Sequence, residues 1–217
     1  MKSILVIGTG RFGRHFAKKM NDLGNDVVIV DKDAAVISAL EGDFTDAQIG
    51  DCTNEHIIKS LGVSHFDICF VAIGDDFQSS LVVTSLLKTH GAKYIVSKAK
   101  QDIQADLLRK IGADEIVYPE KETAEKLAVR HNAKNVFDFL PISSDFAIVE
   151  IPILPSWIGK TVVEADVRRL HNINIVCVKK GNAVKMASAD YIFAENDHIV
   201  VFGTPGDIFK LSAKIGA

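Results

Sequence analysis

Cysteine is scarce in this chain and provides no framework for disulfide bonds. The 217 residues contain only Cys52, Cys69 and Cys177, which lie far apart in the sequence. An odd and scattered set of cysteines favours free thiols in a reducing compartment over a disulfide-stabilised secreted fold. Cys69 and Cys177 each fall within an apolar, strand-like run, so we expect both to be small buried core residues.

Long apolar runs and an excess of positive charge are also missing. The longest apolar stretches, residues 4–8 and 26–31, have the length of strands, whereas a bilayer-spanning helix needs roughly 18 to 20 apolar residues. The net charge is −3, and the intermixed charges form no basic field for a nucleic-acid backbone. Met1 and Lys2 lead directly into an apolar run, which predicts no signal peptide. We therefore expect a cytoplasmic protein without a nucleic-acid partner.

Up to about residue 134, short apolar runs alternate with amphipathic stretches. Continuous runs rich in Val and Ile are typical of strands that are buried on both faces of a parallel sheet. Residues 1–134 are therefore predicted to form an α/β domain, a Rossmann-like doubly wound parallel sheet with helices on both faces. The predicted strands are residues 3–8, 26–31, 47–50, 67–74, 94–98 and 115–118.

The pattern changes after residue 134, and residues 135–217 predict a second, smaller α+β domain. Residues 135–145 have the mixed character of a connector, and residues 146–153 alternate like a strand with one face in solvent. A hairpin is expected to turn at Gly181–Asn182. The remaining predictions are a helix over 159–172, a strand over 197–205 and a closing helix over 206–216.

A glycine motif lies between the first predicted strand and the first predicted helix. Gly8 permits a tight turn, Gly10 lets the backbone approach a pyrophosphate, and Gly13 allows close packing of helix on strand. The helix N-terminus supplies free N–H groups for the anion. Asp31, at the end of the second strand, can accept hydrogen bonds from ribose hydroxyls and repel a 2′-phosphate. The motif thus predicts a site for NAD, ATP or ADP rather than NADP.

The ends of two further strands extend this predicted site, because ligands bind at the carboxyl ends of such strands. Asp51 and Cys52 follow the third strand and are expected at the adenine rim. Asp51 could equally cap the next helix. Ala72, Ile73 and Gly74 end the fourth strand beside the glycine turn.

Arg11 lies inside the glycine turn, where backbone N–H groups alone suffice for a pyrophosphate. Its guanidinium can hold phosphate oxygens in a bidentate manner, which suits a polyphosphate tail. The alternative is a solvent-facing arginine at a helix start, where the helix dipole slightly disfavours a cation. We interpret Arg11 as a phosphate contact.

Signatures of catalysis do not accompany the motif. The seven histidines are dispersed, no zinc-ligand spacing occurs, and GxSxG, P-loop lysine and HExxH motifs are missing. A hydride-transfer enzyme needs a proton donor or acceptor beside the nicotinamide, and the C-terminal region offers no such group at useful spacing. We therefore predict no catalytic residues and a nucleotide receptor rather than an enzyme.

Four segments together resemble the N-terminal domain of the RCK (regulator of potassium conductance) family. They are "GTGRFG" at residues 8–13, "GDCT" at 50–53, "VAIGDD" at 71–76 and "GADEIVYPE" at 112–120. The residues that follow resemble the TrkA-C, or RCK C-terminal, domain. The resemblance covers nearly the whole chain and points to the cytosolic regulatory subunits of Ktr/Trk-type bacterial potassium uptake systems.

The resemblance implies a regulator that senses ATP and ADP and gates a separate potassium channel or transporter subunit in the membrane. It further implies homodimers that close into an octameric ring, peripheral at the inner face of the cell membrane. The two nucleotides would set different ring shapes, which requires only that each bind one shape more tightly.

The resemblance also assigns roles to single residues. Arg11 matches an arginine that reaches nucleotide phosphates, and Asp31 matches the ribose carboxylate. Lys98 matches a basic position near the phosphates. Glu120 matches a glutamate at the dimer interface that helps to hold a divalent cation, magnesium or calcium, beside the γ-phosphates. From the sequence alone, Glu120 follows Pro119 in a first helical turn, where an acid is stabilising in any case.

Phe12 in the turn and Lys32 beside Asp31 complete the predicted nucleotide site. In some members of the family the C-terminal domain binds cyclic di-AMP at its dimer interface. Arg168 and Arg169 lie in the corresponding region, although a solvated helix end explains them equally well. Two alternative functions remain open: a small NAD-dependent dehydrogenase, such as one of a tetrapyrrole pathway, and an RCK protein that senses NAD(H).

Overall fold

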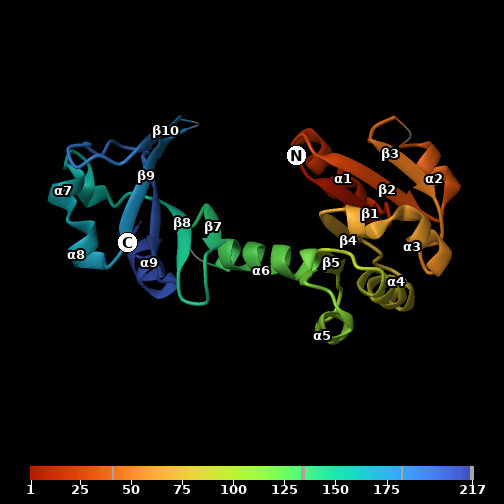
Figure 1. Cartoon of the computed structure of the whole chain (residues 1–217). Helices are drawn as coiled ribbons and strands as arrows, with labels where there is room; N and C mark the ends of the chain where they lie inside the picture. Colours follow the sequence, from red (N-terminus) through yellow and green to blue (C-terminus); the bar gives the residue numbers. More distant parts are fainter. Residues whose placement is uncertain (41, 133–134, 182, 216–217) are drawn as a thin grey trace. The chain divides into compact units, whose positions relative to one another are not determined.

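The computed structural model describes residues 1–40, 42–132, 135–181 and 183–215 (Figure 1). The chain divides into two compact units, Met1–Lys121 and Glu122–Ala217. The predicted domain boundary between residues 134 and 135 borders residues outside the described part of the chain, and it stays a prediction. The described helices include none with both the length and the apolar composition needed to cross a bilayer.

The first unit is built on a parallel sheet. Its strands in the described residues are β1 (Ser3–Ile7), β2 (Asp26–Asp31), β3 (Asp46–Ile49), β4 (Ile68–Val71), β5 (Ile95–Lys98) and β6 (Glu115–Val117). They are hydrogen-bonded in the order β3-β2-β1-β4-β5-β6, and every neighbouring pair is parallel. The order reverses between β1 and β4, which is the topology of doubly wound nucleotide-binding folds. The predicted fold class of this unit is confirmed.

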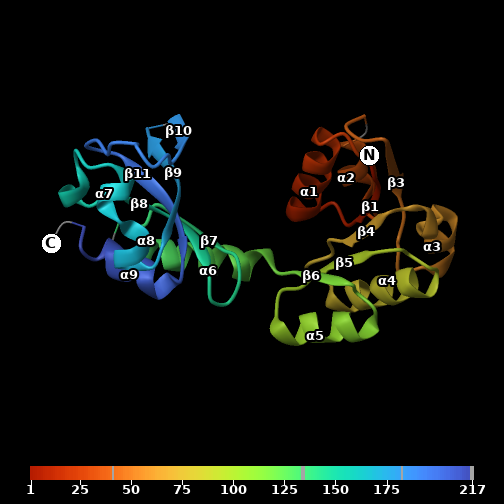
Figure 2. The same cartoon turned by 60° about the vertical axis from the view of Figure 1, so that its left-hand side comes forward.

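Helices cover both faces of this sheet (Figure 2). They are α1 (Arg11–Asp22), α2 (Ala34–Ser38), α3 (Glu55–Leu61), α4 (Phe77–Thr89) and α5 (Asp102–Ile111). Because side chains alternate along a strand, Ile4 and Val6 of β1 enter the core under α1 and α2, whereas Leu5 and Ile7 enter the core under α3, α4 and α5. β1 is thus buried on both faces, as its apolar sequence predicts.

The outermost strand departs from that prediction. Along β3 only Ala47 is partly buried, and Ile49 is 58% exposed. β3 is an edge strand. Among the described strands it pairs only with β2, so no described strand covers its other side. The expectation of burial on both faces is therefore wrong for β3 and holds for the central strands.

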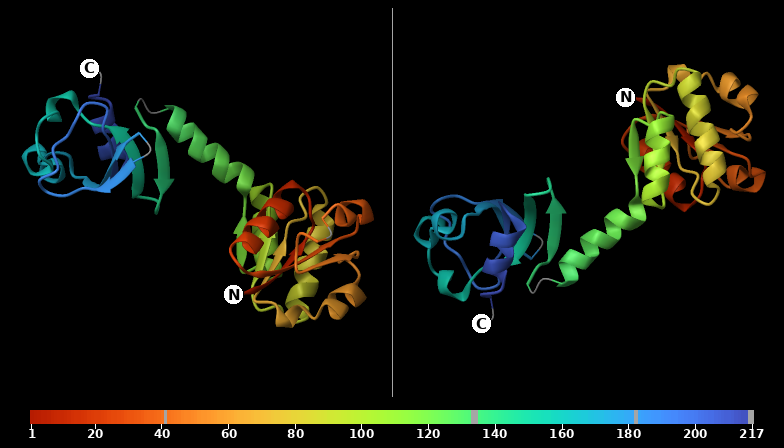
Figure 3. Two further views of the ribbon diagram at one scale, coloured as in Figure 1. Left: turned by 90° about the horizontal axis from the view of Figure 1, so that it is seen from above. Right: turned by 90° about the horizontal axis from the view of Figure 1, so that it is seen from below.

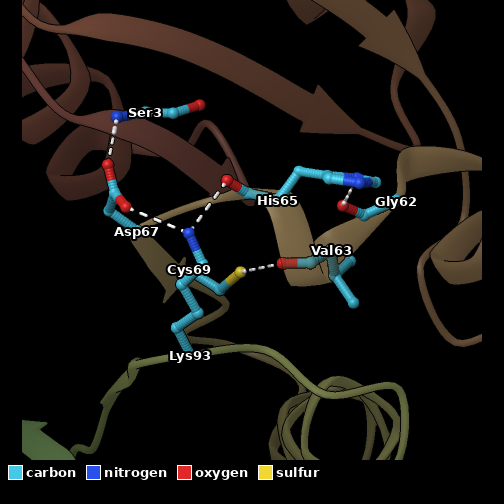
Figure 4. A network of polar contacts seen from close by, with 7 residues as sticks. All are labelled: Ser3, Gly62, Val63, His65, Asp67, Cys69 and Lys93. Carbon is cyan, nitrogen blue, oxygen red and sulfur yellow. Dashed lines mark hydrogen bonds and ion pairs between the residues drawn. The ribbon is translucent and has the colours of Figure 1, made fainter.

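Hydrogen bonds and an ion pair connect the segments at the amino-terminal ends of the central strands (Figure 4). The carboxylate of Asp67 accepts hydrogen bonds from the N–H of Ser3, at 2.9 Å, and from the ammonium of Lys93, at 3.2 Å. The Ser3 N–H, followed by the Lys93 ammonium, lowers the pKa of Asp67. The thiol of Cys69, buried as predicted, donates to the carbonyl of Val63 at 3.7 Å. These residues stabilise the amino-terminal ends of the strands, whereas the glycine turn follows the carboxyl end of β1.

The second unit is a smaller α+β domain, as predicted (Figure 3). Its elements are β7 (Asp138–Pro141), β8 (Ala147–Pro152), α7 (Val162–Ala165), α8 (Val167–His171), β9 (Asn174–Lys180), β10 (Ala183–Met186), β11 (His198–Gly203) and α9 (Pro205–Ser212). The strands form an antiparallel sheet in the order β10-β9-β11-β8-β7. Ala147, Val149 and Ile151 alternate into its core, where they meet Trp157. The long helix α6 (Pro119–Asn132) begins in the first unit and continues into the second.

The second unit differs from the sequence expectations in several places. The predicted connector contains strand β7, whose Phe139 is buried. The predicted helix over 159–172 is divided into α7 and α8 because Asp166 adopts a left-handed conformation with φ of 44°. Cys177 is half-buried rather than buried. β9 and β10 form the predicted hairpin pairing, but Asn182 of the predicted turn lies outside the described residues.

Glu150 lies on β8 between two basic side chains and is only 13% exposed. It accepts hydrogen bonds from Lys179 and, at 2.9 Å, from Nδ1 of His198. Burial raises the pKa of the Glu150 carboxyl, but these two hydrogen bonds outweigh it and leave the pKa below its ordinary value of 4.5. The carboxylate therefore contributes stability above about pH 4.5, and that contribution is lost as the pH falls through the folded-state pKa.

Glu150→Gln is expected to reduce the free energy of unfolding of the second unit by about 1–3 kcal/mol at neutral pH, because it removes charge-assisted hydrogen bonds. The difference from the wild type should shrink as the pH falls below about 4.5. Trp157, the only tryptophan, is buried in this unit, so its fluorescence in urea titrations follows the relevant transition. A difference that stays constant with pH would contradict the assignment of the stabilising charge to Glu150.

Candidate functional site

A cleft of about 260 Å³ opens at the carboxyl ends of β1, β2, β3 and β4. This is the place where the strand order reverses and where doubly wound sheets bind their ligands. The cleft brings together most of the predicted nucleotide site, from four separate segments of the chain. The predicted residues that line it are Gly8, Gly10, Asp31, Lys32, Asp51, Cys52, Ala72, Ile73 and Gly74.

The glycines of the turn meet distinct steric demands. Gly8 has φ of +90°, a left-handed conformation that only glycine adopts without strain. A Cβ on Gly13 would lie 2.1 Å from the carbonyl oxygen of Gly8 and 3.0 Å from Cβ of Ala72. A Cβ on Gly10 would meet nothing within 4 Å. Gly8 and Gly13 are therefore required by the fold itself, whereas Gly10 leaves open space above the turn.

The first turn of α1 places backbone donors next to the cleft, ahead of the first intrahelical hydrogen bond. Gly10 is the N-cap and offers no side-chain hydrogen bond. The N–H of Arg14 bonds to the carbonyl of Gly10 at 3.0 Å, so the N–H groups of Arg11, Phe12 and Gly13 precede the first intrahelical bond. Such a helix N-terminus favours an anion through both its donors and its dipole.

Asp31 is tied to the glycine turn through Thr9. Its Oδ2 accepts hydrogen bonds from the N–H and the hydroxyl of Thr9, at 2.6 and 2.9 Å, and its Oδ1 accepts from the N–H of Asp33 at 3.0 Å. Thr9 is fully buried. The sequence analysis did not identify Thr9, because it occupies a variable position of the glycine motif, which places no demand on the side chain there.

Asp51 and Cys52 line the cleft after β3. The hydroxyl and N–H of Thr53 donate to Asp51 and lower the pKa of its carboxyl. Asn54, rather than Asp51, caps α3 through the N–H of His56, so the capping alternative is wrong. Burial raises the pKa of the Cys52 thiol to about 12, which leaves it protonated and unreactive.

Two acidic residues that the analysis of single residues did not select also line the cleft. Asp76 caps α4 by accepting from the N–H and hydroxyl of Ser79, and these bonds lower the pKa of Asp76. Asp75 is paired with the ammonium of Lys100, whose hydrogen bond lowers the pKa of Asp75. Asp76 was recognisable in the sequence as an N-cap before an apolar helix. The partner of Asp75 was not, because Lys100 belongs to a distant segment.

Lys32 lines the cleft, whereas Lys98 and Arg11 lie beside it without lining it. Lys98 is 9% exposed, and its ammonium lies 2.8 Å from Glu120 and 5.4 Å from the centre of the Phe12 ring. Arg11 is exposed at the first position of α1, and its charge, with that of Lys98, contributes to the lowered pKa of Asp75. The predicted site thus holds charges of both signs: Lys32 is close to Asp51 and Asp76, and Lys100, Lys98 and Arg11 are close to Asp75.

Glu120 does not lie among the residues that line the cleft. The hydrogen bond from Lys98 lowers the pKa of Glu120 and keeps its carboxyl ionised. Within the described residues, no group of three or more His, Cys, Asp or Glu side chains is arranged to hold a metal ion. A divalent cation at Glu120 would therefore need further oxygen ligands, such as nucleotide phosphates, beside that carboxylate.

Comparison with known proteins gives two domain matches that follow the two units. The chain matches the family model of the TrkA-N domain over residues 4–119 and that of the TrkA-C domain over residues 146–216. It is 35% identical over 215 residues to Ktr system potassium uptake protein C of Bacillus subtilis (strain 168), which covers 99% of this chain and 97% of that protein. It is 31% identical over 215 residues to Ktr system potassium uptake protein A of Vibrio alginolyticus, with 99% and 96% covered.

Solved structures resemble both units. The GsuK channel bound to NAD matches with a TM-score of 0.70 at 20% identity, over 100% of this chain and 40% of that one. GsuK bound to ADP matches with a TM-score of 0.53 at 18% identity, over 59% of this chain and 34% of that one. At such identities the likeness establishes the fold alone, and the chain spans less than half of the channel's length.

Proposed function

We infer the function of this chain from its family: it belongs to the Ktr system potassium uptake proteins, with one TrkA-N and one TrkA-C domain. We propose that it is a non-enzymatic regulatory subunit that binds an adenine nucleotide and gates a separate potassium channel or transporter subunit in the membrane. The nucleotide is ATP or ADP, bound in the cleft of the first unit.

The arrangement of the glycine turn is the observation that carries this proposal. Backbone N–H groups at the start of α1 and the side chain of Arg11 adjoin the glycine turn, and Asp31 is hydrogen-bonded to the same turn through Thr9. The donors and the cation fit phosphates, whereas the carboxylate fits ribose hydroxyls. Asp51 and Asp76 also line the cleft and add negative charge that disfavours a 2′-phosphate, and the nearby Lys32 offsets part of that charge.

The residues of the cleft favour binding over catalysis. Among the described residues that line it, no histidine occurs, and Cys52 has a pKa raised to about 12 by burial. Asp76 and Asp51 are committed to local hydrogen bonds with Ser79 and Thr53. A dehydrogenase needs a group that exchanges a proton beside the nicotinamide, and these residues do not provide a matched donor and acceptor pair.

The proposal is tested by identifying and measuring the bound nucleotide. Native mass spectrometry of the purified protein should show ATP or ADP, and both should raise the thermal midpoint at micromolar concentrations. NADH serves as the competitor. NAD sensing is the second candidate, since Asp31 suits the ribose of NAD equally well, and a much tighter binding of NADH than of ATP would establish it in place of the first.

Replacement of Glu120 by Gln is expected to abolish any magnesium or calcium dependence of ATP binding, because the amide removes the anionic ligand of the proposed cation. The measurement is ATP titration with and without each cation, for wild type and Glu120→Gln. Glu122→Gln, two positions further along α6, is the matched control and should retain the dependence. If Glu120→Gln responds to the cations as the wild type does, Glu120 is not a ligand.

The family also supports proposals about assembly. We place the chain in the cytoplasm, peripheral at the inner face of the cell membrane, as homodimers in an octameric ring. Arg168 and Arg169 belong to the five-residue helix α8. We propose that their guanidinium groups contact the phosphates of cyclic di-AMP in a dimer of the C-terminal domains. Light scattering of the purified protein, with and without each nucleotide, tests the ring.

A further inference from the structure

We propose that Thr9 is a positioning residue of the nucleotide site, and that it leaves Asp31 able to accept a hydrogen bond from only one of the two ribose hydroxyls. The inference rests on the proposed function, because it assumes that the ribose of an adenine nucleotide meets Asp31. It goes further in assigning a selective role to a residue outside the three motif glycines.

Thr9 holds Asp31 with two donors at one oxygen atom. Its N–H lies 2.6 Å and its hydroxyl oxygen 2.9 Å from Oδ2 of Asp31. Thr9 is fully buried, and the turn on its amino-terminal side is fixed by the hydrogen bond from the N–H of Gly8 to the carbonyl of Val30 at 2.8 Å. Both donors are therefore immobile, and the orientation of the carboxylate is set before any ligand arrives.

The acceptor capacity of Asp31 is nearly filled. An ionised carboxylate offers about four lone-pair positions, two on each oxygen. The donors of Thr9 take both positions on Oδ2, and the N–H of Asp33 takes one on Oδ1 at 3.0 Å. The remaining position is on Oδ1. A ribose diol offers two hydroxyl donors, so one of them has to find its partner elsewhere or remain in contact with water.

The test compares ATP with its 2′-deoxy, 3′-deoxy and 2′,3′-dideoxy analogues by calorimetric titration of the full-length wild-type chain. One single-deoxy analogue should bind about tenfold more weakly, as expected for the loss of one hydrogen bond to a charged group, and the other within about twofold of ATP. The dideoxy analogue should be no weaker than the affected single-deoxy analogue. Equal losses for both single-deoxy analogues, additive losses in the dideoxy analogue, or no loss for any analogue would overturn the inference.

Thr9→Val provides the second measurement, because a methyl replaces the hydroxyl at nearly constant volume and removes one of the two donors that hold Oδ2. The carboxylate is then held less firmly, so the affinity difference between the two single-deoxy analogues should become smaller than in the wild type. Thr9→Ser keeps the hydroxyl and should retain the wild-type pattern, while thermal melting establishes that each variant is folded. A Thr9→Val protein with the wild-type pattern would remove the role of Thr9. If the wild type binds NADH but neither ATP nor any of its analogues, the proposed nucleotide is wrong. This outcome differs from ATP binding without a difference between the single-deoxy analogues, which refutes only the inference about Thr9.

Discussion

Replacement of Gly13 by alanine is expected to lower the free energy of unfolding of the first unit by about 3 kcal/mol or more, because the new methyl group collides with backbone. Its Cβ would lie 2.1 Å from the carbonyl oxygen of Gly8, which cannot rotate away as a flexible side chain does. Gly8 is itself fixed at φ of +90° and packed against Ile73. The turn and α1 must therefore separate, which exposes the core beneath Ala17.

The two units report this effect separately. Far-UV circular dichroism in urea follows both units, whereas the fluorescence of Trp157 follows the second unit. In Gly13→Ala the dichroism of the first unit should be lost at lower urea, and the Trp157 transition should stay in place. Gly10→Ala is the matched control, because its φ of −59° and open surroundings accept a methyl group. Equal stability of the two variants would contradict the steric argument.

Arg11→Ala is expected to weaken ATP binding by about 10- to 100-fold, the loss that follows removal of a charge-assisted contact. ADP binding should fall by less than about threefold, because we expect the guanidinium to contact the γ-phosphate, which ADP lacks. Arg11 is exposed, so the variant should fold and melt like the wild type. Calorimetric titration with each nucleotide gives the two ratios.

Arg14→Ala is the control for Arg11. Arg14 is also exposed on α1, one turn further along. The Arg14→Ala substitution therefore removes the same charge without removing the proposed phosphate contact. Arg11→Lys keeps the charge but loses bidentate geometry, and it should bind ATP with intermediate affinity. If Arg11→Ala weakens ATP and ADP equally, or if Arg14→Ala has the same effect, the terminal-phosphate role of Arg11 is wrong.

The sequence predicted the parts of the site that local geometry dictates. Gly8 needs a positive φ and Gly13 needs close packing, so the spacing of these glycines between strand and helix implies a defined turn. Asp31 ends β2, and in a doubly wound sheet that end lies beside the turn. These positions were predictable because each depends on residues close in the chain or on the fixed order of the sheet.

Contacts between distant segments were not predictable in the same way. The pairing of Lys100 with Asp75 depends on how the ends of β4 and β5 approach each other. The division between α7 and α8 was missed because the left-handed Asp166 leaves the apolar spacing of the segment unchanged. β7 was missed because it is short, ends in Pro141 and buries only Phe139. Apolar periodicity reports which side chains are buried in long elements, and it is weak for short or interrupted ones.

The pairing of Lys98 with Glu120 and of Lys100 with Asp75 has a consequence for how ligands arrive. The two ammonium groups are already neutralised, so a phosphate tail that reaches them enters by an exchange of anions. The local charge then changes by less than the charge of the tail, because each displaced carboxylate leaves its ammonium group. Glu120 lies in the opening turn of α6, and once it has left Lys98 its carboxylate is available to the divalent cation proposed beside the γ-phosphates.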